Sequence, residues 1–199
     1  MKTILGCLLC LPCLAVRPAA GAEETLLKGE VDHGGFGGPV AQWTLIDRDS
    51  ALLVGGRGGW IIDHTFILGG AGHGLVTRPT HQTSLGRRRM EFGYGGVELG
   101  LVLLSERLVH IYLHALVGGG QVGLRDESMH DRDNDPMDGL HDAVFAGDAG
   151  IDAEMNVTSW FRVTLGAGYR LIRDTELETV TNADLSGPQA SLMLKFGSF

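Results

Sequence analysis

Hydrophobic and polar residues alternate one by one along several stretches of the chain. In the clearest stretch, residues 161–171, every odd position is apolar or aromatic, whereas the even positions carry Arg162, Arg170, threonine or glycine. Residues 109–117 and 143–155 show the same period of two. Successive side chains of a β-strand point to opposite faces, so each stretch predicts a strand with one apolar and one polar face.

Eight such strands are predicted, and no segment has the pattern of an amphipathic helix. The strands cover 38–46, 51–61, 65–76, 89–103, 108–123, 143–156, 160–173 and 187–199. Within 89–103 the apolar positions change parity after Tyr94, and a β-bulge at Gly95-Gly96 would bring both halves onto one face.

The connections between the predicted strands alternate between short and long. They are short at 62–64, 104–107 and 157–159, and long and polar at 77–88, 124–142 and 174–186. The connection at 47–50 is short, although the alternation of connections along the chain assigns it to the same end of the barrel as the long ones. Up-and-down barrels of the bacterial outer membrane have an even number of antiparallel strands, short periplasmic turns and longer outer loops. The loop lengths therefore favour such a barrel.

The first 22 residues are predicted to be a signal peptide. Lys2 precedes an apolar run that extends to Val16 and is too short to span a bilayer, and Ala20 and Ala22 fit a small-residue cleavage site. The three cysteines (Cys7, Cys10 and Cys13) all lie in this segment, so the mature chain would contain neither a disulfide nor a thiolate site. We expect an N-terminal extension over 23–37 and the barrel over 38–199.

Composition narrows the function classes further. Glycine accounts for 31 of 199 residues, but without a three-residue period and with only 6 prolines, which excludes a collagen-like chain. The net charge of −8 argues against a nucleic-acid partner, because nucleic-acid-binding domains usually carry a basic face. After residue 23 no apolar stretch is long enough for a transmembrane helix.

The polar faces of the predicted strands carry many ionisable side chains. In a narrow eight-stranded barrel these faces line the interior, which side chains fill, so opposite charges must pair there. We interpret them as a barrel-interior charge network rather than an ion pathway. Its predicted members are Arg57, Glu91, Glu98, His110, His114, Asp148, Asp152, Glu154, Arg162 and Arg170. A metal site at His110 and His114 is a weaker interpretation, since no glutamate accompanies the pair.

Aromatic residues gather near the strand ends that would meet the periplasm. Tryptophan, tyrosine and phenylalanine are enriched where a barrel wall crosses the membrane–water interface. The predicted aromatic girdle consists of Trp60, Phe66, Tyr112, Trp160, Phe161, Phe196 and Phe199.

The end of the chain, residues 194–199, resembles the C-terminal strand of bacterial outer-membrane barrels, which commonly ends in phenylalanine and serves as an assembly signal. Phe199 lies off the parity of Leu192, Leu194 and Phe196. The glycine-rich run 55–66 also resembles a hairpin from small outer-membrane proteins. The resemblance implies an all-β, eight-stranded antiparallel transmembrane barrel like OmpA and OmpX, located in the bacterial outer membrane. It implies the barrel assembly machinery as a partner and carries no catalytic residue.

Two loop features suggest ligands. Asp131, Asp133, Asp135 and Asp142 occupy positions 1, 3, 5 and 12 of a calcium-loop template, but Pro136 replaces the glycine of the sharp turn. We therefore expect weak divalent-cation binding over 131–142 at most, or a merely solvated loop, and no other cofactor.

A basic cluster of Arg87, Arg88 and Arg89 is the second feature, because arginine matches phosphate oxygens. It predicts contact with lipopolysaccharide, or alternatively a solvated rim.

The sequence thus predicts a non-enzymatic outer-membrane barrel with a structural or surface-binding role and no general-diffusion pore. One alternative is an enzyme that modifies lipid A, using His81 with Ser84 or Ser128 with His130, although neither pair forms a recognisable nucleophile–base–acid set. The other is a soluble lipocalin-like barrel with its apolar face turned inward to hold a ligand.

Overall fold

The computed structural model describes residues 31–77, 80–83, 86–126, 140–177 and 180–199. Their elements, in chain order, are β1 (His33–Ile46), β2 (Asp49–Ile62), β3 (Phe66–Leu75), β4 (Thr80–Thr83), β5 (Gly86–Leu103), β6 (Val109–Asp126), β7 (Leu140–Asn156), β8 (Phe161–Arg173), α1 (Asn182–Leu185) and β9 (Gly187–Ser198).

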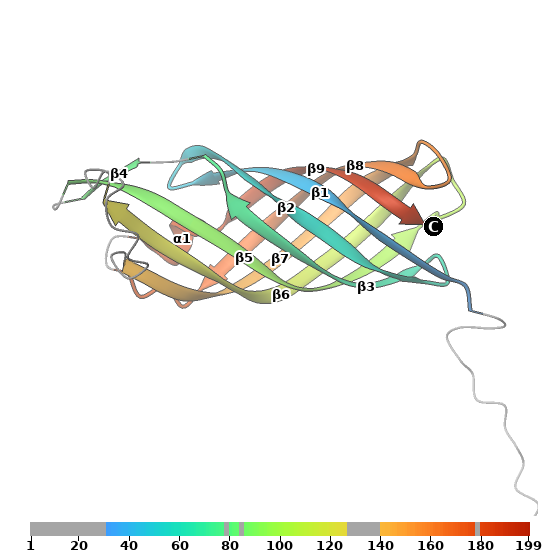
Figure 1. Cartoon of the computed structure of the whole chain (residues 1–199), viewed down its shortest axis with the longest axis horizontal. Helices are drawn as coiled ribbons and strands as arrows, with labels where there is room; N and C mark the ends of the chain where they lie inside the picture. Colours follow the sequence, from blue (N-terminus) through green and yellow to red (C-terminus); the bar gives the residue numbers. More distant parts are fainter. Residues whose placement is uncertain (1–30, 78–79, 84–85, 127–139, 178–179) are drawn as a thin grey trace, which may run out of the picture.

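The eight long strands form one closed, antiparallel barrel (Figure 1). Each pairs with its neighbours along the chain, and the barrel closes where β1 pairs with β9. The short strand β4 pairs with the start of β5 and is not part of the wall, because β3 pairs directly with β5. The predicted eight-stranded, all-β, up-and-down barrel is thereby confirmed.

Most predicted strand boundaries agree with the structure to within three residues. The exception is β1, which begins at His33 rather than at 38, and whose glycine-rich start pairs with the end of β2. This start was missed because glycines at 34, 35, 37 and 38 interrupt the alternation. The strand β4 and the four-residue helix α1 were not predicted.

The barrel has two distinct ends. At the terminal end, β1 begins, β9 ends, and the connections are 63–65, 104–108 and 157–160 (Figure 1). At the loop end lie the β1–β2 turn and the longer connections. In that turn Asp47 and Arg48 have φ of 47° and 67°, as in the two-residue hairpin turns that match the twist of the strands.

Strand β5 runs through Gly95-Gly96 without a bulge. Its register is unbroken both against β3, from Phe66↔Leu101 to Gly74↔Gly93, and against β6. Met90, Phe92 and Tyr94 consequently point inward, on the same face as Glu98. The predicted bulge is wrong because the barrel interior changes from polar to apolar toward the loop end.

The interior contains two apolar clusters, one toward each end. Near the loop end, inward side chains of β1, β2 and β5–β8 pack against Val180 and Leu185; they include Ile46, Leu53, Met90, Phe92, Val122, Leu124, Val144 and Ile172. Toward the terminal end, Phe36, Val40, Ile61, Ile67, Val102, Tyr112 and Met193 pack together, with Phe199 against them.

Residues 174–177 and 180–186, between β8 and β9, lie over the loop end of the barrel (Figure 1). Leu185 in α1 is fully buried, and its carbonyl oxygen accepts a hydrogen bond from Arg170 Nε at 2.8 Å. The Asp47 backbone N–H donates to the Asp184 carbonyl at 3.0 Å, which joins the segment to the β1–β2 turn. This segment therefore caps the loop-end apolar cluster.

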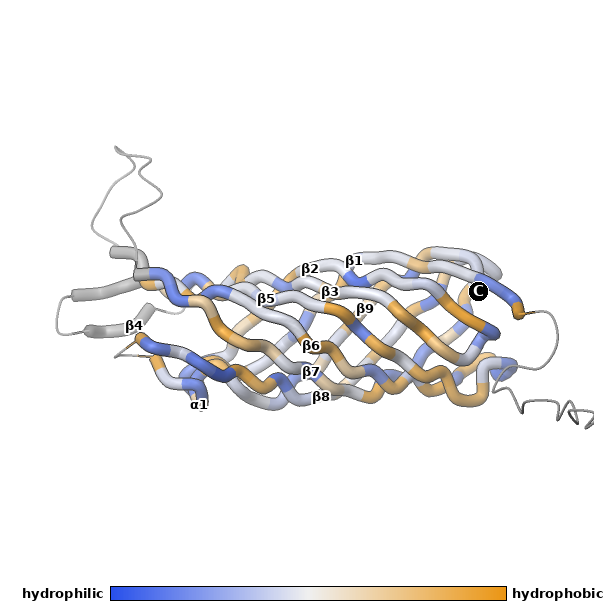
Figure 2. Tube along the Cα trace, turned by 90° about the horizontal axis from the view of Figure 1, so that it is seen from below, coloured by the Kyte–Doolittle hydropathy of each residue, from blue (hydrophilic) through white to orange (hydrophobic). Residues whose placement is uncertain are grey.

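The outside of the barrel is largely apolar. Leu99, Leu165 and Ile151 are 62%, 61% and 52% exposed, although each belongs to a regular strand. In Figure 2, orange segments are frequent on the strands toward the terminal end, where the C-terminus is labelled. Within the described residues, no helix is long and apolar enough to cross a membrane.

Candidate functional site

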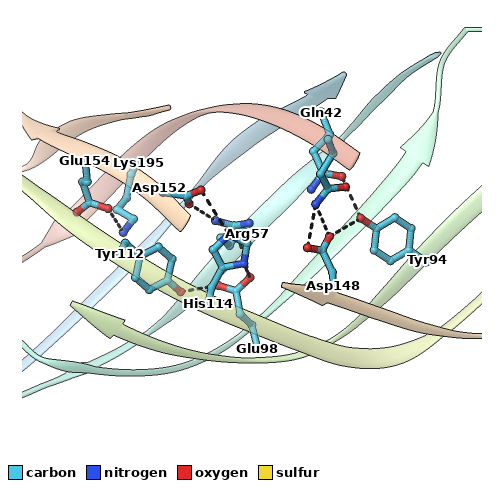
Figure 3. Close-up of polar contacts among 11 residues, drawn as sticks. Gln42, Arg57, Tyr94, Glu98, Tyr112, His114, Asp148, Asp152, Glu154 and Lys195 are labelled. Carbon is cyan, nitrogen blue, oxygen red and sulfur yellow. Dashed lines mark hydrogen bonds and ion pairs between the residues drawn. The ribbon is translucent and has the colours of Figure 1, made fainter. Parts of the chain in front are cut away.

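Buried ionisable side chains occupy the lumen in three groups along the barrel axis (Figure 3). They come from alternate positions of their strands. Registers such as His110↔Glu154 and Tyr112↔Asp152 place these side chains from β6 and β7 beside one another. The alternation predicted from sequence thus builds the charged interior directly.

The middle group is centred on Arg57 of β2. Its Nε lies 3.0 Å from Glu98 Oε2 and its Nη1 donates to Asp152 Oδ2 at 2.9 Å. Tyr112 donates its hydroxyl to Glu98 Oε1 at 2.6 Å, and His114 Nε2 lies 3.4 Å from Asp152 Oδ1. One guanidinium thereby connects carboxylates from β5 and β7 across the lumen.

The terminal-end group surrounds Glu154. This carboxylate accepts hydrogen bonds from Lys195 Nζ and from Arg162 Nη1, the latter at 2.8 Å, and His110 Nε2 lies 3.0 Å from it. The Arg162 guanidinium in turn stacks on the Phe199 ring, 3.7 Å from its centroid. Glu154 is thus the shared anion of two cations that would otherwise be isolated inside the barrel.

The loop-end group surrounds Asp148. Its Oδ2 accepts the Tyr94 hydroxyl at 2.7 Å, and both carboxylate oxygens lie 2.8 Å from Gln189 Nε2. Arg170 lies over the Phe92 ring, 5.3 Å from its centroid, and over that of Tyr94. This group therefore joins the polar lumen to the apolar cluster beneath the cap.

The structure places the predicted interior residues inside the barrel with one exception. The residues that face inward are Arg57, Glu98, His110, His114, Asp148, Asp152, Glu154, Arg162 and Arg170. Glu91 is the exception: it is exposed on the outer wall, on the same face of β5 as Val97 and Leu99. Its predicted inward position depended on the bulge that β5 does not contain.

The predicted aromatic girdle is only partly on the outer wall. Trp60, Trp160 and Phe196 are 49%, 58% and 40% exposed at the terminal end. Phe161 stacks on Phe196 with 5.0 Å between ring centroids, and Phe66 is half-buried at the start of β3.

Tyr112 and Phe199 do not belong to this girdle. Tyr112 is fully buried in the lumen, because it shares the inward parity of His110 and His114. Phe199 shares the inward parity of Met193 and Lys195 and packs on Arg162, which explains why it lies off the parity of Phe196.

The loop-end residues predicted to bind ligands are only partly described. Arg89 is half-buried on β5, whereas the side chains of Arg87 and Arg88 are outside the described residues. Asp142 of β7 accepts a hydrogen bond from the Glu176 backbone N–H.

The remaining residues of the calcium-loop template and the signal peptide cannot be placed. Asp131, Asp133, Asp135 and residues 1–22 lie outside the described ranges. So do Ser84, Ser128, His130 and the side chain of His81, which belong to the enzymatic alternative. No group of three metal-ligating side chains occurs among the described residues.

Sequence reasoning missed several members of the interior groups. Lys195 occupies the polar position between Leu194 and Phe196, so its alternation alone could have identified it. Tyr94 was missed because the assumed bulge separated it from Glu98. Gln42 and Gln189 are uncharged, so the pairing of opposite charges gives no signal for them, although both are buried.

Comparison with known proteins identifies the architecture. No family model and no curated relative matches the sequence. The N-terminal β-barrel domain of Pseudomonas aeruginosa OprF aligns with a TM-score of 0.50 at 10% identity, covering 83% of this chain and 96% of that domain. Neisserial surface protein A aligns with a TM-score of 0.51 at 13% identity, and the alignment covers 85% of this chain and 99% of that protein. The chain therefore has the fold of small outer-membrane barrels.

Proposed function

We propose that this protein is a non-enzymatic barrel of the bacterial outer membrane, which acts structurally or by surface binding through its loop end. The observation that carries the proposal is its inverted distribution of polarity. Arg170, Lys195 and Glu98 are at most 1% exposed inside the barrel, whereas Leu165, Leu99 and other large apolar residues are exposed outside. Such an exterior is suited to lipid and unsuited to water.

The same distribution argues against the soluble lipocalin-like alternative. A lipocalin-type barrel turns apolar side chains inward around a ligand cavity and leaves its charges in water. Here the middle of the lumen is filled by paired charges such as Arg57 with Asp152. An apolar ligand would have to displace these ion pairs.

The filled lumen supports a role other than the diffusion of solutes through the barrel. Eight-stranded barrels are just wide enough for side chains to fill. In the described residues, one apolar cluster fills the lumen under α1, and the cluster around Phe36 packs beside Lys195 and Glu154 toward the terminal end. A continuous water-filled path would require one of these clusters to open.

The proposed partners follow from position. Outer-membrane lipid would cover the wall, and Arg87, Arg88 and Arg89 would contact lipopolysaccharide phosphates at the loop end. The C-terminal strand would be read by the barrel assembly machinery. The acidic stretch 131–142 would bind a divalent cation weakly.

Fractionation with heat-modifiability on a gel tests the proposal. Cells expressing the full-length chain should yield it in the outer-membrane fraction, and unboiled samples should migrate differently from boiled ones because the folded barrel resists detergent. Planar bilayers containing the purified protein should show no sustained conductance. Recovery in a soluble fraction would overturn the membrane assignment, and steady channel currents would overturn the closed lumen.

A further inference from the structure

A hollow on the outside of the barrel, near its loop end, includes Arg89, for which contact with lipopolysaccharide phosphates is proposed above. Its volume is about 830 Å³. It extends over β5 and β6, with the end of β3 on one side and the start of β7 on the other. Around it lie the outward residues Arg89, Glu91, Gln121 and His141 and the glycines Gly74, Gly93, Gly95, Gly119 and Gly123.

The floor of the hollow is made of backbone. Gly95 pairs with Gly119, and Gly93 of the same strand pairs with Gly74 of β3. A Cβ added at Gly119 would meet its nearest neighbour, Val144 O, at 3.4 Å, and one at Gly74 would meet only Val54 O, at 3.9 Å. Side chains at these positions would project into open space, so the hollow exists because they are glycines.

Polarity changes across the hollow along the barrel axis. On its terminal-end side lie Val97, Val117 and Phe145, which are 60%, 60% and 43% exposed. On its loop-end side lie Arg89 and His141. The hollow thus spans the upper edge of the apolar band, where the head groups of an outer leaflet would begin. Its occupant should have an apolar part below and an anionic, hydrogen-bonding part above.

We propose that this hollow binds one phosphorylated glycolipid of the outer leaflet. An acyl chain would lie on the Gly95–Gly119 floor beside Phe145, and a sugar phosphate would meet the guanidinium of Arg89, whose planar fork matches phosphate oxygens. The amide of Gln121 can hydrogen-bond to sugar hydroxyls. This inference rests on the outer-membrane function proposed above and assigns it a specific lipid site on the wall.

Native mass spectrometry of the full-length protein in nanodiscs tests the site. The discs contain phosphatidylcholine with bis-phosphorylated lipid A, and the readout is lipid A retained per barrel. The wild type and Gly37→Leu should retain one molecule; Gly37 is an outward glycine away from the hollow, with nothing within 4 Å of an added Cβ. Gly119→Leu, which fills the floor, and Arg89→Gln should retain at least about ten-fold less. If Gly119→Leu does not fold, Gly74→Leu replaces it.

Equal retention of lipid A by Gly119→Leu and Gly37→Leu would overturn the site. So would a wild type that retains phosphatidylglycerol, in discs that contain it in place of lipid A, as well as it retains lipid A. Heat-modifiability and membrane recovery are measured on the same preparations. If both hold for the wild type while lipid A binding is unselective, only this inference fails. If the wild type is not recovered from membranes, the proposed function fails with it.

Discussion

At the scale of single residues, Glu154 holds the terminal-end charges together. Replacing it by glutamine (Glu154→Gln) leaves Lys195 and Arg162 without their shared anion inside the barrel. Breaking a buried ion pair in this way costs about 3–5 kcal/mol. We therefore expect a clearly lower urea midpoint for unfolding from lipid vesicles. The matched control is Glu106→Gln, since Glu106 is exposed in the β5–β6 connection and should leave the midpoint unchanged. An equal shift for both variants would contradict this role of Glu154.

Gly118 offers a second test at this scale. An added Cβ would collide with the backbone of Gly95 and Gly96 on β5, and a strand backbone cannot move aside as a flexible side chain can. Gly118→Ala should therefore cost about 1–3 kcal/mol, as overpacking does, and reduce the heat-modifiable fraction after refolding. Gly37→Ala, with open space at its Cβ, should refold like the wild type. Normal refolding of Gly118→Ala would show that β5 and β6 can separate without loss.

The sequence predicted correctly which side chains face inward wherever apolar and polar positions alternate along a strand without interruption. Arg57 and Asp152 lie within regular alternation, so their inward position could be deduced without knowing their partners. Glu91 and Tyr94 were misplaced because an interior of one polarity was assumed throughout β5. Which cation meets which carboxylate depends on strand register and barrel closure, and neither is visible in a local pattern.

At the scale of elements, the cap over the loop end gives a direct prediction. Leu185, the last residue of α1, is fully buried, so Leu185→Ala should lose about 2–5 kcal/mol of unfolding free energy, the usual range for a buried leucine. Denaturant unfolding measures the loss. Leu171→Ala, on the outer face of β8, is the control and should lose less, because Leu171 is already 37% exposed. Similar losses would mean that the cap does not seal the apolar cluster.

The elements that the sequence did not reveal are short. Four residues are too few for a helical period, so α1 could not be distinguished from a polar loop. The strand β4 pairs only with the start of β5 among the described residues and lacks an apolar face. The eight wall strands were predictable because each has one face toward lipid and one toward the lumen.

At the scale of the whole molecule, the inverted polarity of the barrel can be tested on its outer wall. Leu165 is 61% exposed in mid-strand on β8. Leu165→Arg would place a charge against lipid, at a cost of about 2–4 kcal/mol near the bilayer midplane. Folding into vesicles, followed by the heat-dependent gel shift, should be impaired.

The control for this test lies at the end of the barrel. Val157, 49% exposed in the β7–β8 connection, should accept arginine (Val157→Arg) with little effect on folding into vesicles. If Leu165→Arg also inserted as well as the wild type, the β8 wall would not face lipid.

The closure of the barrel between β1 and β9 has a consequence for how the cell handles incomplete chains. Every other strand pair in the wall joins neighbours along the chain, so the seam from Gly35↔Ser198 to Thr44↔Gln189 can form only once the end of the sequence has been made. A product ending before Gly187 would present two unpaired edges beside exposed apolar side chains, which invites aggregation and proteolysis. Chains released by early termination of translation would thus be degraded. Pulse–chase labelling of a 1–186 truncation should show rapid turnover, whereas the full-length protein should be stable.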